Sequence, residues 1–99
     1  MMRQTDINAV AERMTPAALL EQLAEEAIEL AHAAGKYARL IRGESPTNIT
    51  PEEAHRRVKE EMSDVFLVAR VVKAKGFDFD SQQISEEKLN RWRERLGVK

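Results

Sequence analysis

The stretch EEAIEL (residues 25–30) places three carboxylates in a run that is otherwise apolar, and it organises the expected fold. A second run, EEMSDV (residues 60–65), repeats the pattern, so the chain contains the spacings Glu26-x-x-Glu29 and Glu61-x-x-Asp64. Residues three apart on a helix are neighbours on one face. Each pair can therefore direct two carboxylates at one point.

Helical periodicity, at about 100° per residue, indicates which of these acids lie near the interior. The expected apolar stripe of the first run consists of Leu20, Leu23, Ala24, Ala27, Ala31 and Ala34. Glu26 and Glu29 flank this stripe, whereas Glu25 falls almost opposite to it and should face solvent. The stripe of the second run consists of Val58, Met62, Val65, Ala69 and Val72, with Glu61 and Asp64 to one side. We therefore expect four acids to border two packed helices.

Two interpretations of these acids remain open on spacing alone. Four carboxylates beside a helix interface repel one another, and their desolvation is costly without a counter-charge. A hard divalent cation such as Mg²⁺ relieves both problems, because it binds oxygen ligands and is commonly shared between carboxylates and substrate phosphates. In the alternative, the acids belong to solvated helix faces, which are common in a chain that is 33% charged.

The two acidic motifs, with Lys36 and Arg39 after the first, resemble the signature helices of MazG-like all-α nucleoside triphosphate pyrophosphohydrolases. The likeness covers roughly residues 19–92. It implies hydrolysis of a ribo-, deoxyribo- or modified nucleoside triphosphate to the monophosphate and pyrophosphate, a reaction suited to house-cleaning of the nucleotide pool. It also implies a homodimer or homotetramer. The implied ligands of Mg²⁺, or of Mn²⁺ in its place, are Glu26, Glu29, Glu61 and Asp64.

Other residues are candidates for orienting water or binding substrate. One of the four acids, or Glu25 or Glu60 beside them, would orient the attacking water. Lys36 lies two turns beyond Glu29 on nearly the same face, where it would contact a phosphate or remain a solvated lysine. The resemblance suggests that phosphate and base are contacted by residues near the C-terminus, namely Lys88, Asn90, Arg93 and Trp92. Trp92 would stack on a base, or pack against the bundle as an amphipathic side chain.

Composition limits the class of protein. Ninety-nine residues predict one domain spanning residues 1–99, and the net charge of −1 argues against a nucleic-acid-binding surface. The absence of Cys excludes a disulfide framework and a thiolate nucleophile. We find neither a signal peptide nor an apolar run of about 18 residues, so no membrane partner is expected and the cytoplasm is the default location.

Start and stop signals predict an all-α, antiparallel bundle of about four helices. A first helix over residues 7–14 would be capped by Thr5-Asp6, and a second would run from Thr15-Pro16 to residue 42 and end at Gly43. Residues 44–49 form an expected loop beside the site. Thr50-Pro51, with Glu53 in the capping-box position, would begin a helix to residue 75 that stops at Gly76. Asp80 or Ser81 would cap a last helix to residue 96, after Phe77 and Phe79, which we expect to plug the bundle end.

Two rival functions follow from other features of the chain. Residues 65–72 are apolar almost all round, which is typical of a helix that is central or shared with another chain. The chain would then be a non-catalytic helical oligomerisation or interaction protein. A carboxylate-bridged di-iron bundle is a second rival, but such sites usually use Glu-x-x-His pairs. Neither acidic motif supplies a His. His32 and His55 lack a recognisable metal partner at a useful spacing, so we expect them to be surface residues.

Overall fold

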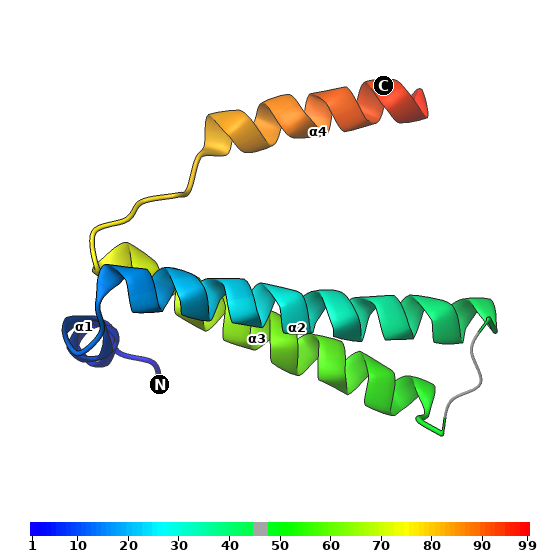
Figure 1. The fold of residues 1–99 in the computed structure, drawn as a ribbon. Coiled ribbons are helices and arrows are strands. Elements are labelled where there is room, and N and C mark those ends of the chain that lie inside the picture. The colour runs from blue at the N-terminus through cyan, green and yellow to red at the C-terminus, as the bar shows by residue number, and fades with distance from the viewer. Residues whose placement is uncertain (45–47) are drawn as a thin grey trace.

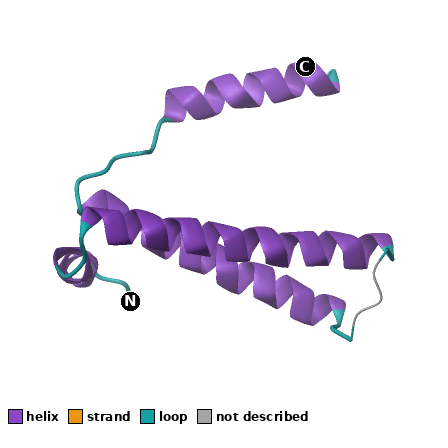
Figure 2. Ribbon diagram, in the orientation of Figure 1, coloured by secondary structure: helices purple, strands orange, loops and turns teal. Residues whose placement is uncertain are grey.

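The computed structural model describes residues 1–44 and 48–99, and every regular element in these two segments is a helix (Figures 1 and 2). The elements are α1 (Gln4–Glu12), α2 (Pro16–Arg42), α3 (Pro51–Ala74) and α4 (Gln82–Leu96). The all-α class and the four expected helices are thereby confirmed. Residues 45–47 of the expected loop lie outside the described residues. Within the described segments, no helix is both long and apolar enough to cross a bilayer.

Local signals in the sequence set the ends of the three longer helices. The hydroxyl groups of their N-cap residues accept backbone N–H groups at 3.1 to 3.2 Å, from Ala18 to Thr15, from Glu53 to Thr50 and from Ile84 to Ser81. These bonds satisfy donors that the first helical turn leaves without a partner. Helix α2 ends at Gly43, whose φ of 69° is a left-handed conformation that glycine adopts without steric cost.

The expected start of α1 is wrong by about one turn. This helix begins at Gln4 after Arg3, which makes no side-chain capping bond, and it ends at Glu12. Thr5 and Asp6 therefore lie inside the first turn and do not cap it. Asp6 is still favourable there, because its charge complements the helix dipole and pairs with Arg3 at 3.3 Å.

The core of the molecule lies at one end of a hairpin formed by α2 and α3 (Figure 1). The two long helices run antiparallel, and α1 packs against α3 near the start of α2. The buried core residues are Ile7, Ala11, Leu19, Val71 and Val72, with Met14, Val68, Ala74 and Phe77 packed against them. The apolar segment after Asp64 is thus partly central, since Val71 and Val72 are buried whereas Phe66 and Leu67 remain exposed.

The side of α2 that faces α3 differs from the expected stripe. Of the six expected residues only Leu23 is half-buried, and Leu20, Ala24, Ala27, Ala31 and Ala34 are all exposed. The side of α2 whose side chains are buried or half-buried carries Leu19, Leu23, Glu26, Leu30, Ala33, Tyr37 and Leu40. This set is displaced from the alanine-rich one by about one residue. Packing has selected the larger side chains, because a Leu buries more apolar area than an Ala.

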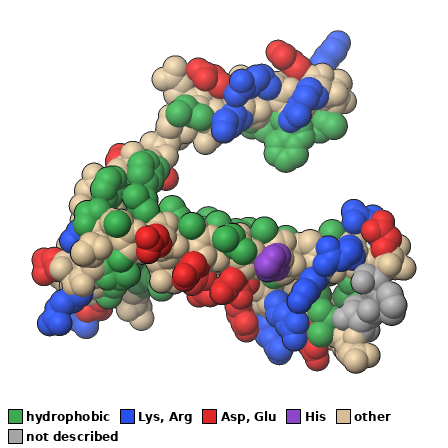
Figure 3. All heavy atoms as spheres, viewed as in Figure 1, with side chains coloured by type: hydrophobic (Ala, Val, Ile, Leu, Met, Phe, Trp, Pro, Cys, Tyr) green, Lys and Arg blue, Asp and Glu red, His purple; other side chains and the backbone are tan. Residues whose placement is uncertain are grey.

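Helix α4 stands apart from the hairpin at the end of an extended linker (Figures 1 and 3). Among the described residues it packs against no other helix, and none of its own residues is buried. Phe77 packs against the core and stacks with Phe79 at a centroid distance of 5.8 Å, but Phe79 itself is exposed. Of the two aromatics expected to plug the bundle end, only Phe77 does so. Within the described part of this one chain, therefore, only the two long helices and α1 pack together.

Candidate functional site

Three of the four predicted metal ligands converge at the middle of the hairpin. Glu26 and Glu29 on α2 and Glu61 on α3 each offer one carboxylate oxygen, and these oxygens lie within 4.8 Å of one another. We call Glu26, Glu29 and Glu61 the acid trio. Asp64, the fourth predicted ligand, follows Glu61 by one turn and is exposed outside the trio. Glu25 is exposed, as the helical geometry predicted.

The trio includes two buried oxygens without hydrogen-bond partners. Gln22 lies one turn before Glu26 and donates from Nε2 to Glu26 Oε1 at 2.9 Å, which holds that side chain in place. The other oxygen of Glu26, Oε2, is buried and has no partner among the described residues, and the same is true of Glu61 Oε2. Buried carboxylate oxygens without donors are costly, so these two atoms favour a ligand that supplies positive charge.

Burial and the neighbouring acids act on the pKa of the Glu61 carboxyl. Burial raises the pKa of the Glu61 carboxyl above its ordinary value of 4.5. The charges of Glu29 and Asp64, a hydrogen bond with Glu29 and the charge of Glu26 raise that pKa further. Every one of these causes opposes the ionised form, which is the form that a metal binds. Asp64 is therefore close enough to act on Glu61 electrostatically although it is not in the trio.

The donor set fits a hard divalent cation. Three carboxylates from two helices provide only oxygen ligands, and Mg²⁺ and Mn²⁺ prefer such ligands. The positive charge of such an ion would cancel the mutual repulsion and satisfy the two buried oxygens. Residues Glu26, Glu29 and Glu61 are the ones that would hold it.

Two members of the trio, Glu29 and Glu61, line a hollow that also carries basic side chains. This hollow is lined by Glu29, His32, Ala33, Lys36, Arg57 and Glu61. Lys36 was predicted from its place on the face of Glu29, whereas Arg57 and His32 were missed. The spacings Glu29-x-x-His32 and Arg57-x-x-x-Glu61 could have identified both residues, because each puts its members on one helix face. His32 and His55 are exposed as expected. The expectation that His32 has no partner at a useful spacing is wrong, because Glu29-x-x-His32 is a Glu-x-x-His pair of the kind used in di-iron bundles. Among the described residues, however, His32 is not one of those whose ligand atoms converge.

Glu60 and Asp64 lie in a neighbouring depression on α3. Its lining consists of Arg56, Lys59, Glu60, Ser63 and Asp64. Arg56 pairs with Glu60 at 3.8 Å, and both side chains are exposed. Glu60 is thus engaged by a cation outside the trio, and Asp64 is the acid of this depression that also influences Glu61.

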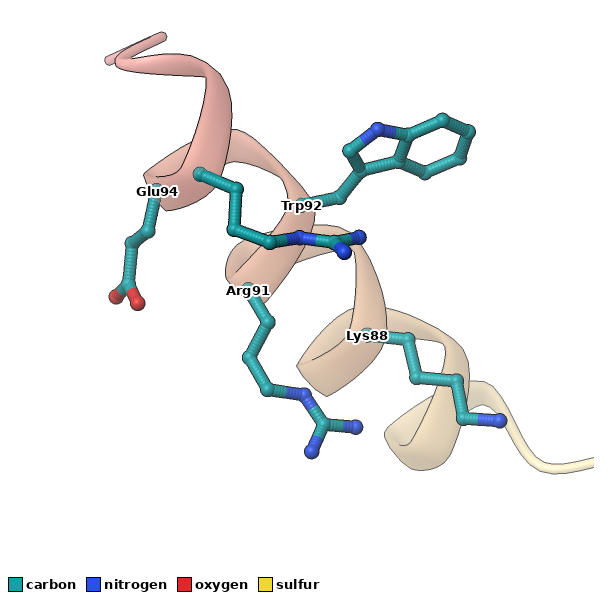
Figure 4. Close-up of a pocket in the computed structure, with 5 residues that line it drawn as sticks. Lys88, Arg91, Trp92 and Glu94 are labelled. Carbon is teal, nitrogen blue, oxygen red and sulfur yellow. The ribbon is translucent and has the colours of Figure 1, made fainter.

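The predicted substrate contacts of the C-terminal region are not joined to the trio within this chain. Lys88 and Trp92 share a shallow hollow on α4 with Arg91, Glu94 and Arg95 (Figure 4). Asn90 and Arg93, the other two predicted contacts, do not line it. Trp92 is 58% exposed and does not pack against the hairpin. The structure therefore groups a different set of α4 cations around Trp92 than the spacing suggested.

No family model, curated protein or solved structure matches the chain. The likeness of the acidic motifs to those of MazG-like enzymes therefore remains a likeness of motifs alone.

Proposed function

We propose that this protein is a Mg²⁺-dependent nucleoside triphosphate pyrophosphohydrolase of the MazG-like kind that its two acidic motifs resemble. The observation that carries the proposal is the acid trio, in which oxygens from two helices lie within 4.8 Å and two buried oxygens lack partners. No described residue donates a hydrogen bond to either of these two oxygens. Such an arrangement is unfavourable for an isolated fold and favourable for a cation-dependent site.

Each residue of the site has a distinct role in this proposal. The trio holds the cation, and Gln22 orients Glu26 through its 2.9 Å hydrogen bond. When bound, Mg²⁺ stabilises negative charge on phosphoryl oxygens and lowers the pKa of a coordinated water. Asp64 is exposed one turn beyond Glu61, so it is the carboxylate best placed to accept a proton from the attacking water. Glu60 is paired with Arg56, which makes it a weaker candidate for that role.

Product analysis tests the reaction. The purified chain is incubated with Mg²⁺ and a panel of canonical and modified nucleoside triphosphates, and the products are separated by chromatography. We expect pyrophosphate and a nucleoside monophosphate from at least one nucleotide. Release of orthophosphate with a nucleoside diphosphate would reject the pyrophosphohydrolase assignment. As a matched pair, Glu29→Gln should abolish the activity, whereas Glu21→Gln, an exposed acid two turns earlier on α2, should retain it.

A second copy of the chain is part of the proposal. Large apolar side chains are exposed on α3 and along α4, namely Met62, Phe66, Leu67, Ile84, Leu89, Trp92 and Leu96. A helix without intrachain packing is rarely stable alone in water, because tertiary packing provides most helical stability. We infer a homodimer or homotetramer in which a partner copy covers these faces.

The same exposed faces favour one alternative, a non-catalytic helical oligomerisation protein. Under that alternative the acid trio is a solvated surface, and neither stability nor assembly depends on Mg²⁺. The two functions differ in one measurement, because only the enzyme releases pyrophosphate in a manner that Glu29→Gln abolishes. Assembly without any turnover of the nucleotide panel would favour the alternative.

A further inference from the structure

The hollow beside the acid trio contains two cations that no acid neutralises directly. Lys36 on α2 and Arg57 on α3 line it together with Glu29 and Glu61. Yet none of the ion pairs and side-chain hydrogen bonds of the described residues involves Lys36 or Arg57. Two cations and two carboxylates thus line one hollow without forming ion pairs with one another.

Position along the hairpin separates the two kinds of charge. Arg57 lies one turn before Glu61, and Lys36 lies two turns after Glu29, so both are displaced from the trio toward the loop end of the hairpin. In Figure 3 acidic side chains gather near the middle of the hairpin, and basic ones become prominent toward its loop end, where some acidic ones also lie. A ligand with a cation at one end and anionic groups beyond it would match this order.

The charged groups around the hollow also allow an anion to bind once the trio holds a cation. The trio carries three negative charges when ionised, and Lys36 and Arg57 carry two positive ones. With a divalent cation at the trio and the charge of Asp64 near Glu61, these groups sum to about zero, so Lys36 and Arg57 are no longer needed to offset the acids. Arginine suits phosphate groups in particular, because its planar guanidinium group can donate two parallel hydrogen bonds.

We propose that Arg57, with Lys36, holds the outer phosphates of a metal-bound polyphosphate whose cation sits on the acid trio. The proposal rests on the proposed function and adds an orientation to it. The triphosphate extends from the trio toward the loop end of the hairpin. Arg57 is then a substrate-binding residue that the acidic motifs do not include.

Binding of inorganic probes tests this assignment without turnover of a nucleotide. Titration calorimetry with magnesium tripolyphosphate is compared for the wild type, Arg57→Gln and Arg56→Gln. Arg56 is the matched control, because it neighbours Arg57 in sequence but lies in the other depression and pairs with Glu60. We expect Arg57→Gln to weaken binding about tenfold or more, the usual effect of losing a hydrogen bond to a charged group, and Arg56→Gln to change it little.

Binding of Mn²⁺ alone, followed by electron paramagnetic resonance, should respond in the opposite direction. Loss of the Arg57 charge should leave the affinity for the bare cation unchanged or higher, because a neighbouring positive charge has been removed. The assignment would be overturned if wild type did not bind tripolyphosphate, if the two Arg variants bound it equally, or if Arg57→Gln weakened Mn²⁺ binding as much as tripolyphosphate binding.

The outcomes separate this inference from the proposed function. Tripolyphosphate binding that depends on Arg57, with no nucleotide cleaved, would support the phosphate site and reject the enzyme. Pyrophosphate release with the same kcat and KM in Arg57→Gln and Arg56→Gln would support the enzyme and reject the phosphate site.

Discussion

Glu29 on α2 and Glu61 on α3 direct carboxylate oxygens at each other across the helix pair, and these oxygens lie within 4.8 Å. Burial raises the pKa of Glu61, and the contact with Glu29 raises it further, both through the charge of Glu29 and through a hydrogen bond that requires a proton. Without a metal, the carboxylates of Glu29 and Glu61 repel each other, and a bound proton or cation relieves this repulsion. This relationship connects the pH dependence of stability with the binding of metal.

The first prediction concerns Glu61→Gln and pH. Because the folded state raises the pKa of Glu61 above its unfolded value of about 4.5, the native chain binds more protons than the unfolded chain between the two values. The contribution of Glu61 to stability is thus fully present at low pH and lost as the pH rises through the folded pKa. Glu61→Gln should remove this loss. In chelator at neutral pH, the variant should melt higher than wild type.

Thermal melts in chelator from about pH 4 to about pH 8 check this sign. Wild type should lose more stability than Glu61→Gln across that range. Glu60→Gln is the control, because Glu60 lies outside the trio and pairs with Arg56 at the surface. A Glu61→Gln variant that is less stable than wild type at neutral pH would show that the carboxylate is a structural partner instead.

The second prediction distinguishes trio acids from Asp64. Wild type should gain about 2.7 kcal/mol at a hundredfold excess of Mg²⁺ over Kd, because a ligand bound only by the native state stabilises it. Glu29→Gln should lose most of this gain, and Asp64→Asn should lose less of it although its activity falls. In chelator, both variants should be at least as stable as wild type, since each removes a repelling charge.

Melts of the three proteins in chelator and in excess Mg²⁺ provide the comparison. Equal losses of the Mg²⁺ gain in Glu29→Gln and Asp64→Asn would place Asp64 among the metal ligands. A drop in stability of Asp64→Asn with and without Mg²⁺ would instead indicate a structural role for that residue.

The third prediction tests which face of α2 is buried. Leu19 is 2% exposed in the core, and its replacement by Ala should cost about 2–5 kcal/mol in the free energy of unfolding. Leu20→Ala, on the alanine-rich face, should cost under about 1 kcal/mol because that side chain is 40% exposed. Urea denaturation of the two variants measures the difference. A larger loss for Leu20→Ala would favour the face expected from sequence.

The fourth prediction concerns the N-cap of α3. The Thr50 hydroxyl accepts the backbone N–H of Glu53 at 3.1 Å, so Thr50→Ala should destabilise the fold by about 1 kcal/mol. Thr5→Ala is the matched control, because Thr5 lies within α1 and caps nothing. Its effect on the urea midpoint should be small. Equal losses in the two variants would remove the capping explanation.

The fifth prediction concerns assembly through α4. Leu89→Lys should shift the chain toward the monomer of 11.3 kDa, because Leu89 belongs to the exposed apolar set that we assign to a partner copy. Gln83→Lys adds the same charge at a polar position of α4 and should leave assembly intact. Light scattering at micromolar concentration measures the mass. A wild-type chain that is monomeric and still active would contradict the inferred assembly.

The sequence alone determined the all-α class and most helix ends. Thr15-Pro16, Thr50-Pro51 and the pair Asp80-Ser81 predicted the starts of three helices, and Gly43 predicted the end of α2. Of the pair, Ser81 is the N-cap. These features are readable because a cap depends on a hydroxyl and a backbone N–H only three residues apart. The start of α1 was missed, since Arg3 precedes that helix without a capping side chain.

Tertiary structure decided which faces and which acids meet. The sequence offers two parallel stripes on α2 one residue apart, and only packing against α3 buries the one with Leu19 and Leu30 while the alanine-rich one stays exposed. That choice brings Glu26 and Glu29 to Glu61, leaves Asp64 outside and adds Arg57 beside them. Spacing within one helix fixes which residues share a face. Contacts between helices depend on how side chains of different size fill the interface, which no local pattern specifies.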